Sequence, residues 1–260
     1  MANVTQLKHL EHLEDEMLNY GVEGCMASVN FLKELRKMLG CDNSTGFMQT
    51  KWDGAPSVVC GTDPNSGMFF VGTKSVFAQN SKACYRDADV DLYYEGDLAE
   101  KLKYSLKYFS TLGIQGIVQG DLLFTTDVKR ETVNGEKLYT FTPNTITYGI
   151  PVDHPIGVAT GKAKIGVVFH THYRGNNFQT MQAVAGAKVK GSIEVLSVDN
   201  DTPMDRVGLN HSEELLFDKY VANIEKMCAA SGDFLDELTT LSGTAGAVSY
   251  THLRAHETYD

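Results

Sequence analysis

The chain has 260 residues, of which 42% are hydrophobic and 22% are charged, and its formal net charge is −10 at pH 7. This composition is typical of a globular protein. The acidic balance argues against a protein that coats nucleic acid by electrostatics alone, but it is compatible with an enzyme that has one local basic cleft. No stretch approaches the roughly 18 apolar residues needed to cross a bilayer, and the N-terminus lacks the apolar core of a signal peptide. We therefore expect a cytoplasmic protein with no membrane partner.

The cysteines are odd in number and scattered along the chain, and no two have the spacing of metal ligands. We expect all of them to be reduced thiols: Cys25, Cys41, Cys60, Cys84 and Cys228.

The first part of the chain has helical periodicity. Two apolar stripes within residues 5–39 are separated by Gly21 and Gly24, and Gly40 stands where a C-terminal cap would be. This pattern predicts two helices. Strand patterns begin at residues 47–52, which lead into an Asp-Gly turn.

A series of hairpins and helices follows. Residues 56–77 predict a β-hairpin around the turn at 63–67, and residues 98–108 predict a helix. Residues 116–124 predict a strand, and Asn134-Gly135 predicts a hairpin between 128–133 and 137–141. The last regular elements are a strand at 165–173 and a helix at 212–230. Antiparallel hairpins with helices before and after them indicate the α+β class.

The run Lys51-Trp52-Asp53-Gly54 contains a candidate nucleophile. A lysine attacks a phosphate only as the neutral amine, so its pKa must be lowered by burial or by nearby cations. At the end of a strand, just before a tight turn, the amine of Lys51 would be fixed in a cleft. Gly54 would let the backbone approach a nucleotide closely. Asp53 would point to the same side as Lys51 and orient it or a bound metal ion. An exposed lysine before an ordinary turn is the alternative.

This run resembles motif I of the covalent nucleotidyltransferases, which comprise ATP-dependent DNA ligases, RNA ligases and mRNA capping enzymes. Three later segments resemble further motifs of these enzymes in the right order. Thr73-Lys74-Ser75 is similar to the short motif whose serine and basic residue face phosphates or nucleic acid, and Gly120-Asp121-Leu122-Leu123 is similar to the Gly-Glu-Leu motif, with Asp121 in place of glutamate. Val167-Val168-Phe169 resembles the strand whose aromatic ring stacks on adenine.

The resemblance implies a ligase-type nucleotidyltransferase core of antiparallel sheets with flanking helices. It implies that Lys51 and Asp53 are catalytic, and that Gly54, Lys74, Ser75, Asp121 and Phe169 contact the nucleotide. ATP and Mg²⁺ would be the cofactors, and DNA or RNA ends would be the acceptor. The metal ligands are left unassigned.

Three departures from these motifs leave other functions open. Pro56 replaces the usual basic or amide residue, and the later Glu-Gly motif is missing. Lys188-Val189-Lys190 has the Lys-x-Lys spacing but lacks the preceding strand pattern. The alternatives are a capping-type guanylyltransferase and a phage nucleotide- or nucleic-acid-binding protein whose catalytic site has decayed.

Residues 8–175 also resemble a family of tailed-phage proteins, which implies the cytoplasm of an infected host cell. The quoted segments include 51–56, 70–77 and Pro143-Asn144-Thr145-Ile146. Residues 249–258 resemble a translated sequencing adapter, so we expect a C-terminally truncated chain. The expected organisation is a helical segment (1–44), a nucleotidyltransferase-like core (45–175), a partial C-terminal region (176–245) and an artefactual tail (246–260).

The histidines of the last predicted strand admit two interpretations. His170 and His172 would share one face of that strand. They are either sheet-surface residues or contacts to a metal ion or substrate. Trp52 alternates away from Lys51, which predicts a packing role.

Overall fold

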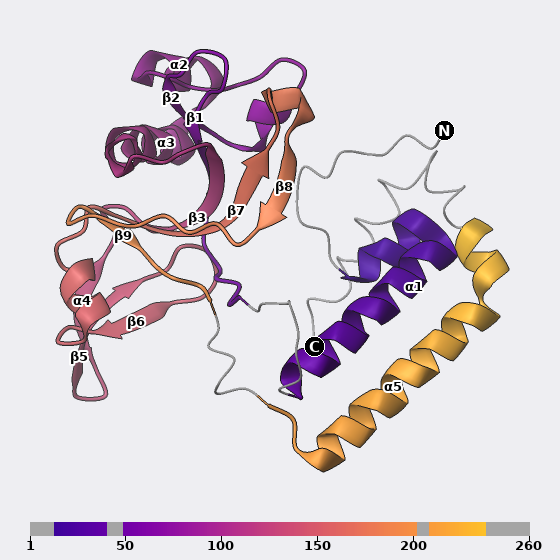
Figure 1. Ribbon diagram of the computed structural model, residues 1–260. Coiled ribbons are helices and arrows are strands. Elements are labelled where there is room, and N and C mark those ends of the chain that lie inside the picture. The colour runs from indigo at the N-terminus through magenta and orange to yellow at the C-terminus, as the bar shows by residue number, and fades with distance from the viewer. Residues whose placement is uncertain (1–12, 41–48, 202–207, 238–260) are drawn as a thin grey trace. The chain divides into compact units, whose positions relative to one another are not determined.

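The computed structural model describes residues 13–40, 49–201 and 208–237, which belong to two compact units (Figure 1). The first unit contains residues 49–201. The second contains residues 13–40 and 208–237.

The first unit is built on a six-stranded sheet. Its neighbouring strands are, in order, β2 (Phe69–Gly72), β1 (Ser57–Thr62), β3 (Ile117–Phe124), β7 (Ile165–Arg174) and β8 (Gln182–Ala185). These pairs are antiparallel, whereas β9 (Val195–Ser197) pairs in parallel with the beginning of β7. The central strands β3 and β7 are buried along most of their length, as their nearly continuous apolar sequences require.

One face of this sheet is covered by α3 (Gly96–Phe109), which follows the short helix α2 (Asp87–Tyr93), as Figure 1 shows. Leu102 and Phe109 of α3 pack against Val118, Leu122 and Val167 of the sheet. The opposite face has two further apolar clusters. One is centred on Phe70 and Phe178, and the other on Leu123 and Phe141.

A second sheet contains β4 (Lys129–Val133), β5 (Glu136–Phe141) and β6 (Tyr148–Pro151), all antiparallel. The β4–β5 turn places Asn134 and Gly135 at positive φ angles of 51° and 84°, which the Asn-Gly sequence favours. The short helix α4 (Pro155–Thr160) follows β6, and single 3₁₀ turns occur at Lys74–Phe77, Ser110–Leu112 and Phe178–Thr180.

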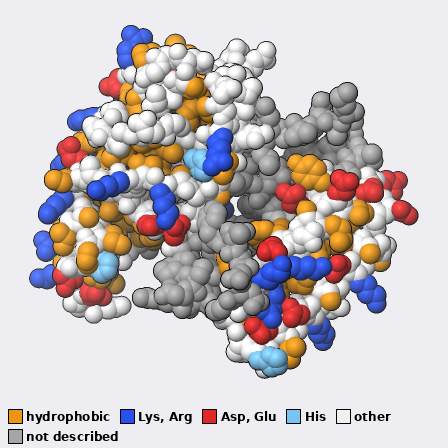
Figure 2. Space-filling view, in the orientation of Figure 1, with side chains coloured by type: hydrophobic (Ala, Val, Ile, Leu, Met, Phe, Trp, Pro, Cys, Tyr) orange, Lys and Arg blue, Asp and Glu red, His pale blue; other side chains and the backbone are white. Residues whose placement is uncertain are grey.

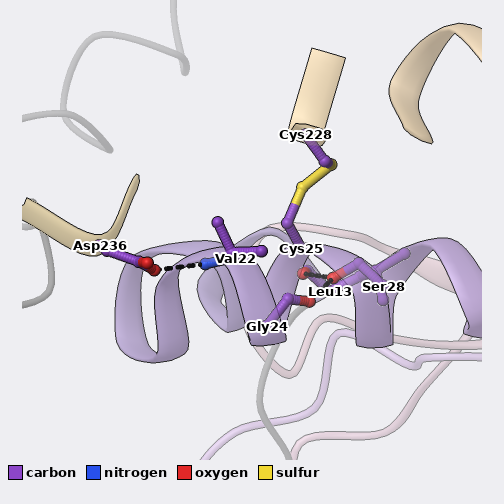
Figure 3. Close-up of a disulfide and its surroundings, with 7 residues drawn as sticks. All are labelled: Leu13, Val22, Gly24, Cys25, Ser28, Cys228 and Asp236. Atoms are coloured by element: carbon purple, nitrogen blue, oxygen red, sulfur yellow. Dashed lines mark hydrogen bonds between the residues drawn. A yellow bond between two sulfur atoms is a disulfide. The ribbon is translucent and has the colours of Figure 1, made fainter. Parts of the chain in front are cut away.

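The second unit pairs α1 (Leu13–Leu39) with α5 (His211–Ala230). Gly21 interrupts α1 with a non-helical backbone (φ 58°, ψ −132°), so α1 is two helical segments. Asn210 caps α5: its side chain accepts hydrogen bonds from two backbone N–H groups, and Glu213 accepts from the Asn210 N–H in return. Cys25 and Cys228 are buried between the helices and form a disulfide with a Cα–Cα distance of 6.0 Å (Figure 3).

The structure is mixed α+β with antiparallel sheets and flanking helices, as the sequence predicted. The 56–77 hairpin, the helix near 98–108, the strands at 116–124 and 165–173 and the helix at 212–230 are all present. The expectation that all cysteines are reduced is wrong for Cys25 and Cys228, because the helix pairing brings them together from distant parts of the chain. Of the other cysteines, Cys60 and Cys84 are buried thiols, and Cys41 lies outside the described residues.

Two further differences concern the beginning and the extent of the first unit. The strand expected at 47–52 is absent from its described part, where Gln49 makes only an isolated bridge to Asp201. The first unit extends to residue 201, beyond the expected limit of 175, because β8 and β9 complete its sheet along β7. The expected tail at 246–260 lies outside the described residues.

Candidate functional site

The Lys51–Gly54 segment lies against the middle of the main sheet. It has no regular secondary structure and leads into β1. The Ala55 N–H donates to the Leu122 carbonyl of β3 at 2.9 Å, and the Leu122 N–H donates to the Pro56 carbonyl at 3.1 Å. A Cβ at Gly54 would lie 2.6 Å from Cβ of Asp121, which is closer than real Cβ contacts. Only glycine therefore permits this approach, which brings the Lys51–Gly54 segment next to Gly120-Asp121.

The two candidate lysines are exposed, so the described residues do not enclose the Lys51 amine in the cleft that the sequence predicted. Lys51 precedes the contact with β3, and Lys74 opens the 3₁₀ turn that follows β2. Gly72 pairs with Val59, and Ser57 pairs with Asp121. Lys74 thus follows β2 at the end of the sheet that also contains Ser57. A ligand over this end of the sheet could meet positive charge from both lysines.

Ser75 is held in a cluster of hydroxyl groups. Its Oγ lies 2.8 Å from the Tyr94 hydroxyl and 2.9 Å from Thr73 Oγ1. The resemblance implied a contact from Ser75 to the nucleotide. In the structure its hydroxyl fixes the turn after β2, which leaves the exposed Lys74 as the side chain of this motif that faces solvent.

Asp53 has a different role from the one expected. Its carboxylate accepts hydrogen bonds from Asn144 Nδ2 (2.8 Å), from the Thr145 N–H and Oγ1 (2.8 and 2.7 Å) and from the Ile146 N–H (3.0 Å). The bond from Asn144, followed by those from Thr145 and Ile146, holds the pKa of Asp53 well below its ordinary value. Three of these donors use Oδ2 and one uses Oδ1. The carboxylate of Asp53 therefore fixes the loop between β5 and β6, a role that the sequence did not predict.

Trp52 packs as expected. Its ring lies 4.9 Å from that of Tyr148, and it borders the apolar cluster around Leu123 and Phe141. The Tyr148 hydroxyl accepts a 2.8 Å hydrogen bond from the Asp53 N–H. Trp52 and Asp53 together join the Lys51–Gly54 segment to the second sheet.

Phe169 lies in the core and not at the site. Its side chain is 2% exposed and makes an edge contact with Phe109 of α3 at 5.5 Å between ring centroids. Stacking on adenine needs an exposed ring face. The expected stacking role is therefore corrected: α3 covers this ring, because Phe169 points to the helix-covered face of the sheet.

A chain of polar side chains crosses the other face, and sequence reasoning missed it. The Tyr173 hydroxyl donates to Gln119 Oε1 at 2.5 Å, and Gln119 Nε2 donates to Ser57 Oγ at 2.8 Å. Burial raises the pKa of Tyr173, so it stays a neutral donor. Gln119 within the apolar run 117–124 was the available signal, because a buried amide on a sheet needs partners.

Asp121 and His170 continue this polar face beside the Lys51–Gly54 segment. Gln119 pairs with Thr171 and Gly120 pairs with Phe169, so His170 is the extra residue of a β-bulge. Its Nε2 lies 3.4 Å from Asp121 Oδ1, and its Nδ1 lies 2.8 Å from Thr171 Oγ1. His170 and Thr171 therefore point to the same side. The alternation of side chains resumes after Thr171. His170 and His172 therefore lie on opposite faces of the sheet, and the prediction that they share one face is wrong.

The described residues contain no group of three His, Cys, Asp or Glu side chains that could hold a metal ion. The site does fit the weaker requirement of Mg²⁺, which commonly uses one or two carboxylates together with substrate phosphates and water. Asp121 is the carboxylate of this site that accepts no hydrogen bond within the described residues, whereas Asp53 accepts four.

The surface charge is mixed. Figure 2 shows Lys and Arg side chains interspersed with Asp and Glu on the face in view. Lys188, part of the Lys-x-Lys spacing, forms an ion pair with Asp201. None of the helices within the described ranges is long and apolar enough to span a membrane.

Comparison with known proteins gives one result. A family model described as "Family of unknown function (DUF6267)" matches residues 3–256. No curated protein and no solved structure matches the chain. Because the match covers nearly the whole sequence, the chain belongs to the DUF6267 family.

Proposed function

We propose that this chain is a ligase-type nucleotidyltransferase in which Lys51 accepts an adenylate from ATP. The observation that carries the proposal is the contact between Gly54 and Asp121. The two segments that resemble motif I and the Gly-Glu-Leu motif are far apart in sequence, and this contact makes them neighbours. A chance likeness of short motifs would not require them to meet.

The proposed chemistry uses groups at this contact. The neutral amine of Lys51 attacks the α-phosphorus of ATP, a nitrogen–phosphorus bond forms, and the bond to the pyrophosphate leaving group breaks. The amine loses its proton to solvent. A bound Mg²⁺ ion supplies charge neutralisation for the phosphates, and the exposed Lys74 adds to it. The adenylate then passes to a 5′-phosphorylated DNA or RNA end, whose acceptor role rests on the resemblance alone.

A second candidate function is nucleotide or nucleic-acid binding without catalysis. Two observations favour it: the carboxylate of Asp53 accepts four hydrogen bonds from residues 144–146, and Phe169 is covered by α3. Both residues were expected to serve the reaction.

The experiment is to incubate the protein with α-labelled ATP and a divalent cation, and to measure label that survives denaturing electrophoresis. Lys51→Arg keeps the charge but removes the nucleophile, and Lys162→Ala removes another exposed lysine as a matched control. The proposal expects label on the wild type and the control, and none on Lys51→Arg. Labelling with GTP in place of ATP would indicate a guanylyltransferase. No label with either nucleotide, together with ATP binding in equilibrium dialysis, would establish the second candidate.

A further inference from the structure

The imidazole of His170 has a buried nitrogen without a hydrogen-bond partner. Within the described chain, Nε2 is one of few buried side-chain nitrogen or oxygen atoms left without a partner. It lies 3.4 Å from Asp121 Oδ1, a distance that suits an ion pair, but the two atoms do not have hydrogen-bond geometry. A buried polar atom without a partner is unfavourable, so its position needs a cause.

The other ring nitrogen indicates what that cause is. Thr171 Oγ1 lies 2.8 Å from Nδ1 and accepts a hydrogen bond from it in the tautomer that carries its proton on Nδ1. Thr171 is buried, so this contact holds the ring in place. With the proton on Nδ1, the lone pair of Nε2 faces a carboxylate oxygen. Two acceptors in this arrangement repel each other unless a cation lies between them. Metal-binding histidines commonly donate their second N–H to an oxygen in this way.

The geometry of the pair suits one shared ion. Two neighbouring ligands that are each about 2.1 Å from an octahedral ion are roughly 3.0 Å apart. The observed separation of Nε2 and Oδ1 is 3.4 Å, so the two atoms need to approach each other by roughly 0.4 Å to share such an ion. No hydrogen bond within the described residues engages the Asp121 carboxylate. The bulge that displaces His170 from the strand alternation brings its ring to Asp121.

We propose that Asp121 and His170 bind a divalent cation, with Oδ1 and Nε2 as the two protein ligands and with water or phosphate oxygens as the others. One nitrogen ligand in this set favours Mn²⁺ over Mg²⁺, because imidazole suits transition metals and Mg²⁺ prefers oxygen. The inference rests on the proposed function for the catalytic use of the ion. The binding itself requires neither nucleotide nor Lys51.

The test is a titration of the protein with Mn²⁺ followed by electron paramagnetic resonance of the unbound ion, without nucleotide. We expect one Mn²⁺ per chain, displaced only by a large excess of Mg²⁺. His170→Gln and Asp121→Asn should each weaken Mn²⁺ binding by at least about tenfold. In His170→Gln the preference for Mn²⁺ over Mg²⁺ should also fall, which a merely structural role would not produce. His172→Gln is the matched control, because this neighbouring histidine points to the other side, and it should leave binding unchanged.

A measurement on the wild type keeps the test independent of variant folding. Pulsed resonance spectra of the Mn²⁺ complex should show coupling to a ¹⁴N nucleus, which only a nitrogen ligand gives. Absence of this coupling, no bound Mn²⁺, or equal weakening by His172→Gln would overturn the proposal and leave a direct ion pair of Asp121 with His170. Lys51→Ala should bind Mn²⁺ as the wild type does. Mn²⁺ binding without adenylate transfer would therefore refute the proposed function alone, and transfer without ¹⁴N coupling would refute the cation site alone.

Discussion

The substitution Gly54→Ala tests the contact on which the proposed function depends. The new methyl group would lie 2.6 Å from Cβ of Asp121 and 2.8 Å from the Leu122 carbonyl oxygen. Both neighbours are on the central strand β3, which is fixed by β1 and β7 on either side. The strand has little room to move, so the Lys51–Gly54 segment must move away.

The size of the effect follows from two contributions. Inserting a methyl group into a packed site costs about 1–3 kcal/mol. Moving the segment also breaks the 2.9 Å hydrogen bond from the Ala55 N–H to the Leu122 carbonyl, at a cost of about 1 kcal/mol. We expect the free energy of unfolding to fall by about 2–4 kcal/mol. Transfer of label from ATP to Lys51 should fall as well, because the segment that carries Lys51 moves away from β3.

Trp52, the only tryptophan, lies within the displaced segment and makes fluorescence a local probe. Urea unfolding should be followed by this fluorescence and by circular dichroism. Gly208→Ala is the control, because its new methyl group would meet nothing nearer than the Leu39 carbonyl at 3.6 Å, and its effect should stay within about 0.5 kcal/mol. If Gly54→Ala is as mild as this control, the close packing of Gly54 on Asp121 is refuted.

Three further substitutions test other assignments. Phe169→Leu should lower the free energy of unfolding by about 0.5–1.5 kcal/mol through loss of the ring contact with Phe109 and leave ATP labelling unchanged; a selective loss of nucleotide binding would contradict its core position. Asp53→Asn should destabilise the protein near neutral pH, because the new amide faces the Thr145 N–H. The stabilisation due to the lowered pKa of Asp53 is present above its unfolded value of 3.8 and is lost as the pH falls, so urea titrations should show the difference between variant and wild type shrinking below about pH 4. Cys228→Ser should lower the melting temperature, since a disulfide spanning 203 residues contributes up to about 5 kcal/mol by chain entropy; a reductant should reproduce this shift in the wild type and do nothing to the variant.

The elements that sequence predicted well are those with strong local signals. The Asn134-Gly135 pair correctly predicted the β4–β5 hairpin, because both residues accept positive φ angles. The apolar run of 165–173 correctly predicted β7. Gly21 correctly predicted the break in α1, because glycine adopts a backbone conformation that other residues avoid.

The elements that were missed depend on distant partners. β9 has three residues and exists because it pairs in parallel with the start of β7. β8 has four residues that join β7 at its other end. Such short segments carry too little periodicity to be recognised alone. The Cys25–Cys228 disulfide likewise depends on the pairing of α1 with α5, which no spacing in the sequence encodes.

The candidate site was predicted in part for the same reason. The run 51–54 was found because its residues are adjacent in sequence, but the close approach of Gly54 to β3 was not predicted. The partner of Asp53 could not be foreseen, since Asn144 and Thr145 come from a loop of the second sheet. His170 was misplaced because strand alternation was assumed, and a bulge changes that alternation by one residue.

The two carboxylates of the site, those of Asp53 and Asp121, differ in their hydrogen bonding. Asp53 accepts four hydrogen bonds and fixes a loop, so its charge is used within the fold. Asp121 has no hydrogen bond to its carboxylate in the described part of the chain, and it faces a histidine nitrogen that also lacks one. Polar atoms without hydrogen-bond partners lower the stability of a protein. They are expected at sites where a bound ligand supplies the missing partners. Asp121 and His170, next to the Lys51–Gly54 segment, therefore form a polar pair whose arrangement the fold alone does not explain.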